Sequence, residues 1–147
     1  MIYDLGELGK VGFSFSLIKK IFMTKDELKK RTKTFHIAVI KACEGFPKNA
    51  AGYEMSKQLI RSAGSVGSNY RAACRGKSTA DFIYKIEIVI EEADESMYWL
   101  EVSEEALLLN QLVTKPLIKE ANELVSIFVA TVKTSKNNKD LLKGKKS

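Results

Sequence analysis

The sequence feature that most constrains the fold is a run of small residues, interrupted by arginines, between Gln58 and Lys77. The run has the spacing of a helix, because Leu59, Val66 and Ala73 recur every seven residues as a narrow apolar seam. Each glycine inside such a helix costs about 1 kcal/mol relative to alanine. We therefore expect this backbone to lie close to another helix, another subunit or a phosphate backbone. The residues predicted to make this close contact are Ser62, Gly64, Ser65, Ser68 and Asn69.

Apolar periodicity and capping residues divide the chain into four helical segments. Thr24 and Glu27 form a capping box at the start of the first helix, which is predicted to end near Gly45. The other helices are predicted over residues 53–75, over 79–109, and from Thr114 and Pro116 to about residue 132. Since the connections are short and no strand-like alternation competes, we expect an all-α protein. It would be one domain, an antiparallel up-down four-helix bundle over residues 23–134.

The two ends of the chain lie outside this pattern. Residues 135–147 are polar and lysine-rich, and we predict that they form a disordered basic tail. Residues 1–22 are predicted to be an extension that is disordered or a misassigned start. Apolar residues beside two lysines would suit a membrane surface or a partner: Leu17, Ile18, Lys19, Lys20, Ile21 and Phe22.

Neither a secretory signal nor a membrane span is predicted. Asp4 and Glu7 stand where a signal peptide would carry positive charge. No apolar stretch reaches the roughly 18 residues that a membrane helix needs. We therefore expect a cytoplasmic protein with no membrane partner.

Charge is segregated along a chain whose formal net charge is +6. Residues 24–77 contain twelve Lys or Arg against four Asp or Glu, whereas residues 78–109 contain one Lys against nine acidic residues. In an antiparallel bundle this pattern predicts one basic face and one acidic face. The faces are either merely solvated or suited to head-to-tail assembly of a ring-like homo-oligomer.

The basic face favours an anionic partner, and nucleic acid is the expected one. Lysines and arginines bind phosphates without reading bases, and no motif for base-specific readout is present. Tyr70 lies among these cations and is interpreted as a packing residue before a base-stacking one. Arg61 has an alternative role, which is to hold Glu91 or Glu95 within the bundle. The predicted nucleic-acid-binding residues are Lys29, Lys30, Arg31, Lys33, Arg61, Tyr70, Arg71, Arg75 and Lys77.

Catalytic and metal-binding patterns are weak. Glu87, Glu91 and Glu95 share one helix face, but a di-iron bundle needs two Glu-x-x-His motifs and the chain has one histidine, His36. The two cysteines, Cys43 and Cys74, lie far apart in the sequence and form neither a metal-binding nor a disulfide framework. We predict a non-enzymatic protein with no metal and no cofactor.

Four stretches resemble a known family: Phe46–Pro47, Gln58–Ala63, Ser65–Asn69, and Phe82 with the acidic, apolar helix after it. They resemble the small bacterial four-helix-bundle proteins encoded within intervening sequences of 23S ribosomal RNA genes. That family is related to the accessory variability proteins of diversity-generating retroelements. The resemblance covers roughly residues 23–132 and implies an up-down bundle, often a pentamer, with a basic surface for nucleic acid and a reverse transcriptase as a partner. Residues 70–76 are more basic here than in many relatives, which indicates a divergent branch.

Two hypotheses follow from these patterns. The first is an oligomeric bundle, associated with an intervening sequence or retroelement, that binds RNA or DNA through phosphate contacts. The alternative is a structural or protein-partner scaffold whose basic face is used in subunit assembly. The first predicts that salt weakens nucleic-acid binding, and the second predicts that salt weakens the oligomer itself.

Overall fold

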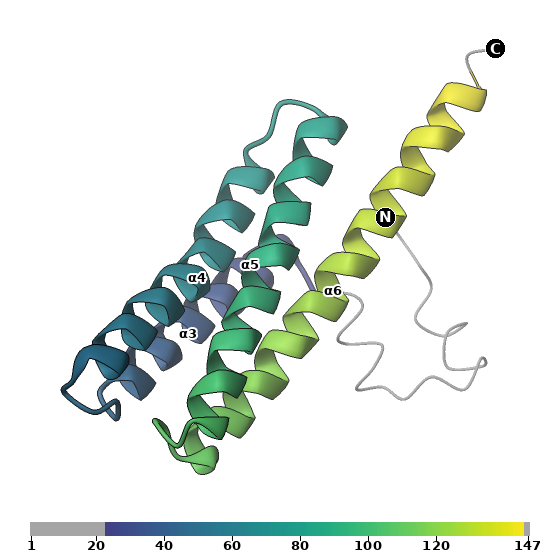
Figure 1. Ribbon diagram of the computed structural model, residues 1–147. Coiled ribbons are helices and arrows are strands. Elements are labelled where there is room, and N and C mark those ends of the chain that lie inside the picture. The colour runs from purple at the N-terminus through teal and green to yellow at the C-terminus, as the bar shows by residue number, and fades with distance from the viewer. Residues whose placement is uncertain (1–22, 146–147) are drawn as a thin grey trace.

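The computed structural model describes residues 23–145 and contains four helices, with no strand among these residues (Figure 1). The helices are α3 (Lys25–Cys43), α4 (Ala50–Cys74), α5 (Thr79–Glu105) and α6 (Gln111–Gly144). The prediction of an all-α protein with four helices is therefore confirmed. The predictions made for residues 1–22 lie outside the described residues.

Local capping determines where three of the helices begin. The backbone N–H of Glu27 donates to Thr24 Oγ1 at 3.1 Å, and the Thr24 N–H donates to Glu27 Oε2 at 2.7 Å, which confirms the predicted capping box. Ser78 caps α5, since its Oγ accepts the N–H of Asp81 at 3.1 Å. Helix α4 begins at Ala50, three residues before its predicted start, because Asn49 accepts the N–H of Gly52 at 2.9 Å.

The turn between α5 and α6 differs from the prediction. Helix α5 ends at Glu105, four residues before the predicted end, because Leu107 takes a positive φ of 56°. The N–H groups of Leu107 and Leu108 donate to the carbonyls of Glu104 and Ser103 at 3.0 and 2.9 Å. This hydrogen-bond pattern is a Schellman motif, which normally has glycine at the position of Leu107. Helix α6 then begins at Gln111, before the predicted restart at Thr114.

The apolar seams meet in one core. Helix α4 packs against α3 and α5, and α6 packs mainly against α5 and less extensively against α3. Buried residues recur at helical spacing along one side of α3, from Leu28 to Val39, and along one side of α6, from Leu117 to Val132. Fully buried seam residues from the four helices include Val39, Leu59, Val66, Ile86, Leu100, Leu124 and Phe128.

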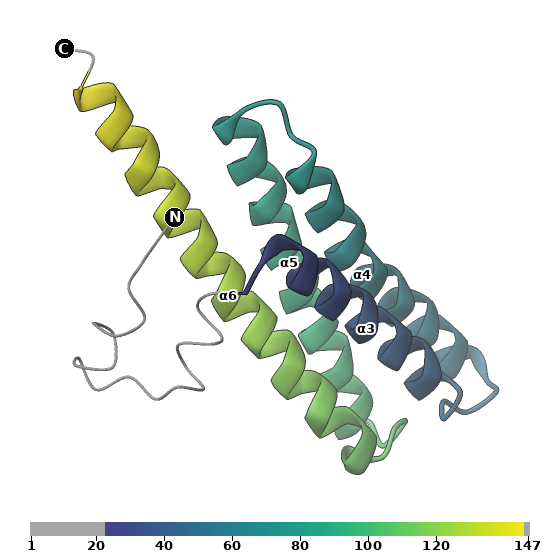
Figure 2. The same ribbon diagram turned by 180° about the vertical axis from the view of Figure 1, so that it is seen from behind.

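Helix α6 is the longest of the four and extends beyond the others at its C-terminal end (Figure 1). The structure corrects the predicted tail boundary here, since residues 135–144 are helical and not disordered. Lysine and leucine are good helix formers, and adding turns to an existing helix avoids the unfavourable nucleation step. Viewed from behind, α3 begins beside the middle of α6, so the last turns of α6 lie beyond the start of α3 (Figure 2).

Candidate nucleic-acid interface

Two glycines of α4 set its register against α3. A Cβ atom on Gly64 would lie 2.9 Å from Cε1 and Nε2 of His36, and a Cβ atom on Gly67 would lie 3.4 Å from Oγ1 of Thr32. The missing side chain of Gly64 therefore leaves room for the His36 ring against α4, whereas the contact at Gly67 has an ordinary van der Waals distance. This register places the first half of α3 beside the second half of α4. The predicted basic residues of both helices consequently lie toward the same end of the molecule, except Arg61, which is nearer the middle of α4.

Arg31 is directed toward α6. Its Nε donates to Glu120 Oε1 at 2.6 Å, and its Nη2 donates to Glu120 Oε2 at 2.8 Å and to Glu123 Oε2 at 2.6 Å. The Arg31 side chain is only 19% exposed. The hydrogen bond to Glu120 raises the pKa of the guanidinium above its already high ordinary value. A cation held by two carboxylates is poorly placed to bind a phosphate, so we leave Arg31 out of the proposed interface.

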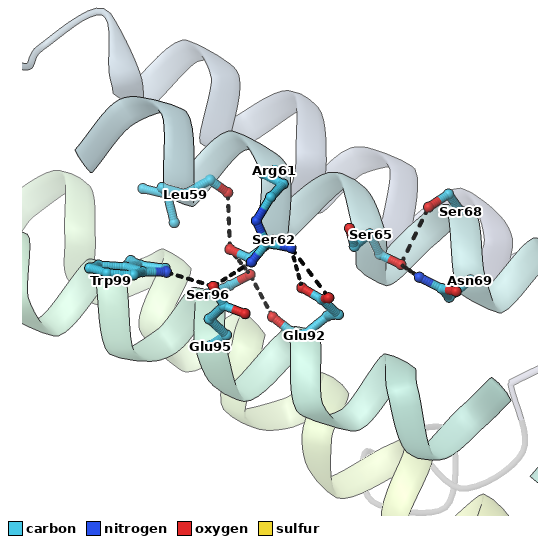
Figure 3. Close-up of polar contacts among 10 residues, drawn as sticks. All are labelled: Leu59, Arg61, Ser62, Ser65, Ser68, Asn69, Glu92, Glu95, Ser96 and Trp99. Carbon is cyan, nitrogen blue, oxygen red and sulfur yellow. Dashed lines mark hydrogen bonds and ion pairs between the residues drawn. The ribbon is translucent and has the colours of Figure 1, made fainter. Parts of the chain in front are cut away.

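Arg61 contacts the acidic helix α5 (Figure 3). Its Nη1 lies 3.2 Å from Glu92 Oε2, and its Nη2 donates to Glu95 Oε1. The indole Nε1 of Trp99 donates to the same oxygen at 3.0 Å. The hydrogen bonds from Arg61 and Trp99 lower the pKa of the Glu95 carboxyl. The alternative role predicted for Arg61, as the partner of Glu95, is confirmed, with Glu92 in place of the exposed Glu91.

Tyr70 is a core residue. It is only 3% exposed, and its ring centroid lies 5.1 Å from that of Phe128. Burial raises the pKa of its hydroxyl above the ordinary value for tyrosine. The packing interpretation is therefore confirmed, and the ring is not available for stacking on a base.

Six predicted basic residues remain at the surface. The side chain of Lys29 is 38% exposed, and its Nζ lies 3.7 Å from Asp26 Oδ1. The other five are exposed and form no ion pair with any residue of the described chain. We call this set the basic stripe: Lys29, Lys30, Lys33, Arg71, Arg75 and Lys77.

The basic stripe follows the junction of α3 and α4. Lys29 and Lys33 are one turn apart on α3, on the side that carries His36. Arg71 is one turn beyond Gly67, on the side of α4 that contacts α3, and Arg75 follows one turn later. Residues four positions apart lie about 6 Å apart along a helix axis. The stripe therefore presents two short rows of cations to one side of the molecule.

The small residues of α4 serve helix packing inside the subunit. The buried Ser62 accepts a hydrogen bond from Ser96 Oγ of α5 at 2.9 Å (Figure 3). Ser68 and Asn69 both donate to the backbone oxygen of Ser65, at 3.4 and 2.9 Å. Of the five predicted contact residues, Ser62 and Gly64 thus contact other helices. For the remaining three, the structure shows side-chain or backbone bonds within α4 only.

Helix α5 presents the opposite charge to solvent. Four of its carboxylates are exposed, and we call them the acidic face: Glu91, Asp94, Glu101 and Glu105. Tyr84 and Tyr98 are exposed on the same helix, at 63% and 55%. The predicted segregation of charge is therefore visible in the folded chain, with the basic stripe on α3 and α4 and the acidic face on α5.

Groups that carry catalytic or metal chemistry lie apart. Within residues 23–145, no three His, Cys, Asp or Glu side chains come close enough to hold a metal ion. The Nε2 atom of His36 is buried beside Gly64 without a hydrogen-bond partner in that range. Burial raises the pKa of the Cys43 thiol to about 11, so this group is largely protonated at neutral pH.

The sequence analysis missed the partner residues that decide which cations are free. Glu120 and Glu123 lie on α6 and hold Arg31 from α3. A second contact that the sequence did not indicate joins α5 to α6: the fully buried Thr114 donates a hydrogen bond to Glu104 across the turn. A carboxylate three residues from another on one helix face is a weak signal, because most such pairs are solvated.

Fold and surface together define a small helical-bundle protein with a basic stripe on α3 and α4 and an acidic face on α5. The chain belongs to the family of 23S rRNA-intervening sequence proteins, whose profile matches residues 24–130. This match confirms the resemblance seen in the sequence. None of the helices in residues 23–145 has the hydropathy needed to cross a membrane.

A solved structure supports the same assignment. It is described as a protein of unknown function from the S23 ribosomal protein family of Bacteroides thetaiotaomicron. The two chains are 27% identical and superimpose with a TM-score of 0.70, over 76% of this chain and 99% of the other. No curated protein matches this sequence.

Proposed function

We propose that this protein is a non-enzymatic, oligomeric helical bundle that binds nucleic acid through the basic stripe by contacts to phosphates. The observation that supports this best is the difference between two groups of cations. Arg31 and Arg61 face acidic residues and are paired, whereas five residues of the stripe have no carboxylate partner in the described chain. Unpaired cations gathered on one side attract a polyanion.

We also propose that the helices run up and down in antiparallel order and that subunits form a ring. The resemblance noted in the sequence suggests five subunits. A ring would repeat the basic stripe around its circumference, so weak phosphate contacts at several subunits would act together on one strand. Affinity would then come from multivalency and not from base reading.

The proposed setting is the bacterial cytoplasm. The family description makes RNA the first nucleic acid to test. The resemblance to accessory variability proteins makes a reverse transcriptase the protein partner to test. No cofactor is proposed, and His36, with Nε2 buried against Gly64, is not placed to act as a general base.

Fluorescence anisotropy with a labelled, mixed-sequence single-stranded RNA tests this proposal. Three neutralising changes would be combined in the stripe: Lys33→Gln, Arg71→Gln and Arg75→Gln. The control carries the same loss of charge at exposed residues elsewhere: Lys57→Gln, Lys115→Gln and Lys119→Gln. Each phosphate contact that is lost should reduce the slope of log affinity against log salt by about 0.7, so the stripe variant should lose about 2 in slope.

The control variant should keep most of the slope of the unmodified protein. Equal weakening of both variants would mean that only net charge matters, and the stripe would not be a binding surface. No RNA binding at low salt by the unmodified protein would refute nucleic-acid binding altogether.

The alternative function is a structural scaffold, and the acidic face favours it. Arg61 already shows that α4 cations pair with α5 carboxylates inside one subunit. Exposed Glu91 and Asp94 on one subunit offer similar partners to the basic stripe of a neighbour. Light scattering after size exclusion separates the two functions. An oligomer that dissociates as salt rises and ignores RNA would identify the scaffold, whereas an oligomer that holds at high salt and binds RNA only at low salt would identify the nucleic-acid binder.

A further inference from the structure

A groove with a volume of about 400 Å³ lies between the first turns of α5 and the C-terminal part of α6. This volume falls in the range of about 300–1,000 Å³ that is typical of ligand pockets. The groove exists because residues 135–144 continue α6 as a helix beside α5. The buried Ile83 and the exposed Tyr84 line it from α5, and most of its other lining side chains are charged. Its ligand should therefore be charged as well.

Three lysines of α6 line this groove: Lys136, Lys139 and Lys143. Their spacings of three and four residues place them on one side of the helix. The Nζ atom of Lys136 lies 2.8 Å from Glu87 Oε1 of α5, so this ion pair joins the two walls. Lys139 and Lys143 form no ion pair with any described residue, although Asp140 also lines the groove. Three lysines against two carboxylates leave the groove positively charged, which favours an anionic ligand.

Tyr84 adds an aromatic ring beside these lysines. It is 63% exposed, and its ring stacks on no other aromatic ring of the described residues. Proteins hold unpaired bases with such an arrangement, because the base stacks on the ring while cations bind the neighbouring phosphates. Tyr70, for which stacking was considered from the sequence, is buried, whereas Tyr84 is open to solvent.

Tyr98 shows that exposure alone does not make such a site. It lies on the same helix and is 55% exposed, but its ring centroid lies 5.1 Å from that of Trp99. The exposed Asp94 and Glu101 lie four residues before it and three residues after it, and so on the same side of α5. These carboxylates would repel a phosphate. The two tyrosines therefore have similar exposure and opposite electrostatic surroundings.

The groove lies at the same end of the bundle as the basic stripe. Arg75 and Lys77 of the stripe lie between the last residue of α4 and the first residue of α5. Tyr84 is in the second turn of α5, about 8 Å from Thr79 along the helix axis. Figure 1 shows the α4–α5 turn and the C-terminal part of α6 at one end of the molecule. A single strand that contacts Arg75 and Lys77 can therefore continue toward the groove.

We propose that this groove binds an unpaired nucleotide of a single-stranded nucleic acid, with the base stacked on Tyr84 and neighbouring phosphates at Lys139 and Lys143. The inference rests on the proposed nucleic-acid binding and adds a preference to it. Phosphate contacts alone would favour a duplex, because its phosphates are more densely spaced. A stacking ring instead requires a base that is not paired. The protein should therefore bind a single strand more tightly than a duplex of the same length at the same salt concentration.

Fluorescence anisotropy with two labelled strands tests the groove separately from the stripe. One strand is oligouridine, and the other is an abasic strand with the same length and sugar. Tyr84→Ala should weaken binding of oligouridine about tenfold, as expected for the loss of one stacked base, and should leave binding of the abasic strand unchanged. Tyr84→Phe keeps the ring and should bind like the unmodified protein. Tyr98→Ala is the matched control and should change neither affinity.

The lysines are tested in the same assay. Lys139→Gln combined with Lys143→Gln should weaken binding of both strands, because both strands carry phosphates. A cross-link gives a second measurement of the stacked base. Ultraviolet irradiation of oligouridine that contains 5-iodouridine should attach the base to Tyr84, and mass spectrometry of the peptides locates the adduct.

The outcomes separate this inference from the proposed function. If the unmodified protein and Tyr84→Ala bind oligouridine equally well, the groove is refuted and the basic stripe still stands. If neither strand binds the unmodified protein at low salt, both proposals are refuted. Equal weakening of both strands by Tyr84→Ala, tighter binding of the duplex, or adducts only at other residues would each contradict a base stacked on Tyr84.

Discussion

Replacing Gly64 by alanine tests whether close approach of α3 and α4 defines the bundle. Alanine gains about 1 kcal/mol over glycine from helix propensity. A Cβ atom at position 64 would, however, lie 2.9 Å from two ring atoms of His36, and the Nε2 atom is buried. Inserting a methyl group into such a contact costs about 1–3 kcal/mol. Gly64→Ala should therefore destabilise the protein by as much as about 2 kcal/mol, despite the better propensity.

Gly67→Ala is the matched control on the same helix face. A Cβ atom there would lie 3.4 Å from Thr32 Oγ1, which is an ordinary contact. This variant should gain up to about 1 kcal/mol. Urea denaturation followed by far-ultraviolet circular dichroism gives both values, and thermal midpoints should separate by about 2–4 °C per kcal/mol.

A double-mutant cycle with His36→Ala assigns the effect to the contact. Removing the imidazole should make Gly64→Ala stabilising, so the two changes should couple by about 1–3 kcal/mol. If Gly64→Ala is as stabilising as Gly67→Ala in the unmodified background, α4 does not need a bare backbone at this position. The account of the small-residue run as a close-contact surface would then be refuted.

Two further predictions concern single side chains. Hydrogen bonds from Arg61 and Trp99 lower the pKa of the Glu95 carboxyl in the folded protein. These bonds therefore stabilise the fold at a pH above the pKa of about 4.3 that glutamate has in the unfolded chain. The stabilisation is lost as the pH falls through the lower pKa of the folded protein. The urea midpoint of the unmodified protein should fall with pH in this range, and the midpoint of Glu95→Gln should fall less. Parallel plots of midpoint against pH for the two proteins would contradict this prediction. Leu107 is 90% exposed at a φ of 56°, so Leu107→Gly should raise the free energy of unfolding by about 1 kcal/mol in the same assay.

The fold could be predicted to within a few residues, because helix starts and apolar seams are local signals. The Thr24 capping box was readable from the sequence and is present. The end of α5 was not readable, because leucine at position 107 takes a conformation that sequence reasoning reserves for glycine. The helical residues 135–144 were missed for a different reason. Their composition lacks an apolar seam, but they continue a helix that is already nucleated.

The candidate site could be predicted only as a set of basic residues. The sequence placed nine residues in that set, of which Tyr70 is buried and Arg31 and Arg61 form ion pairs within the chain. Nothing local distinguishes Arg31 from its neighbour Lys30, since both lie on the same predicted helix. Their different roles follow from which side of α3 meets α6.

The sequence by itself determined that this chain forms four helices, that their seams meet in one core and that basic and acidic residues are concentrated in different helices. These properties depend on residues within a few turns of one another, where periodicity and capping act. Only the tertiary structure decided which cations are free, because Arg31 meets a carboxylate 89 residues away. It also decided that the small residues Ser62 and Gly64 pack inside the subunit. Partners so distant in sequence are chosen by helix register and packing, which no local pattern specifies.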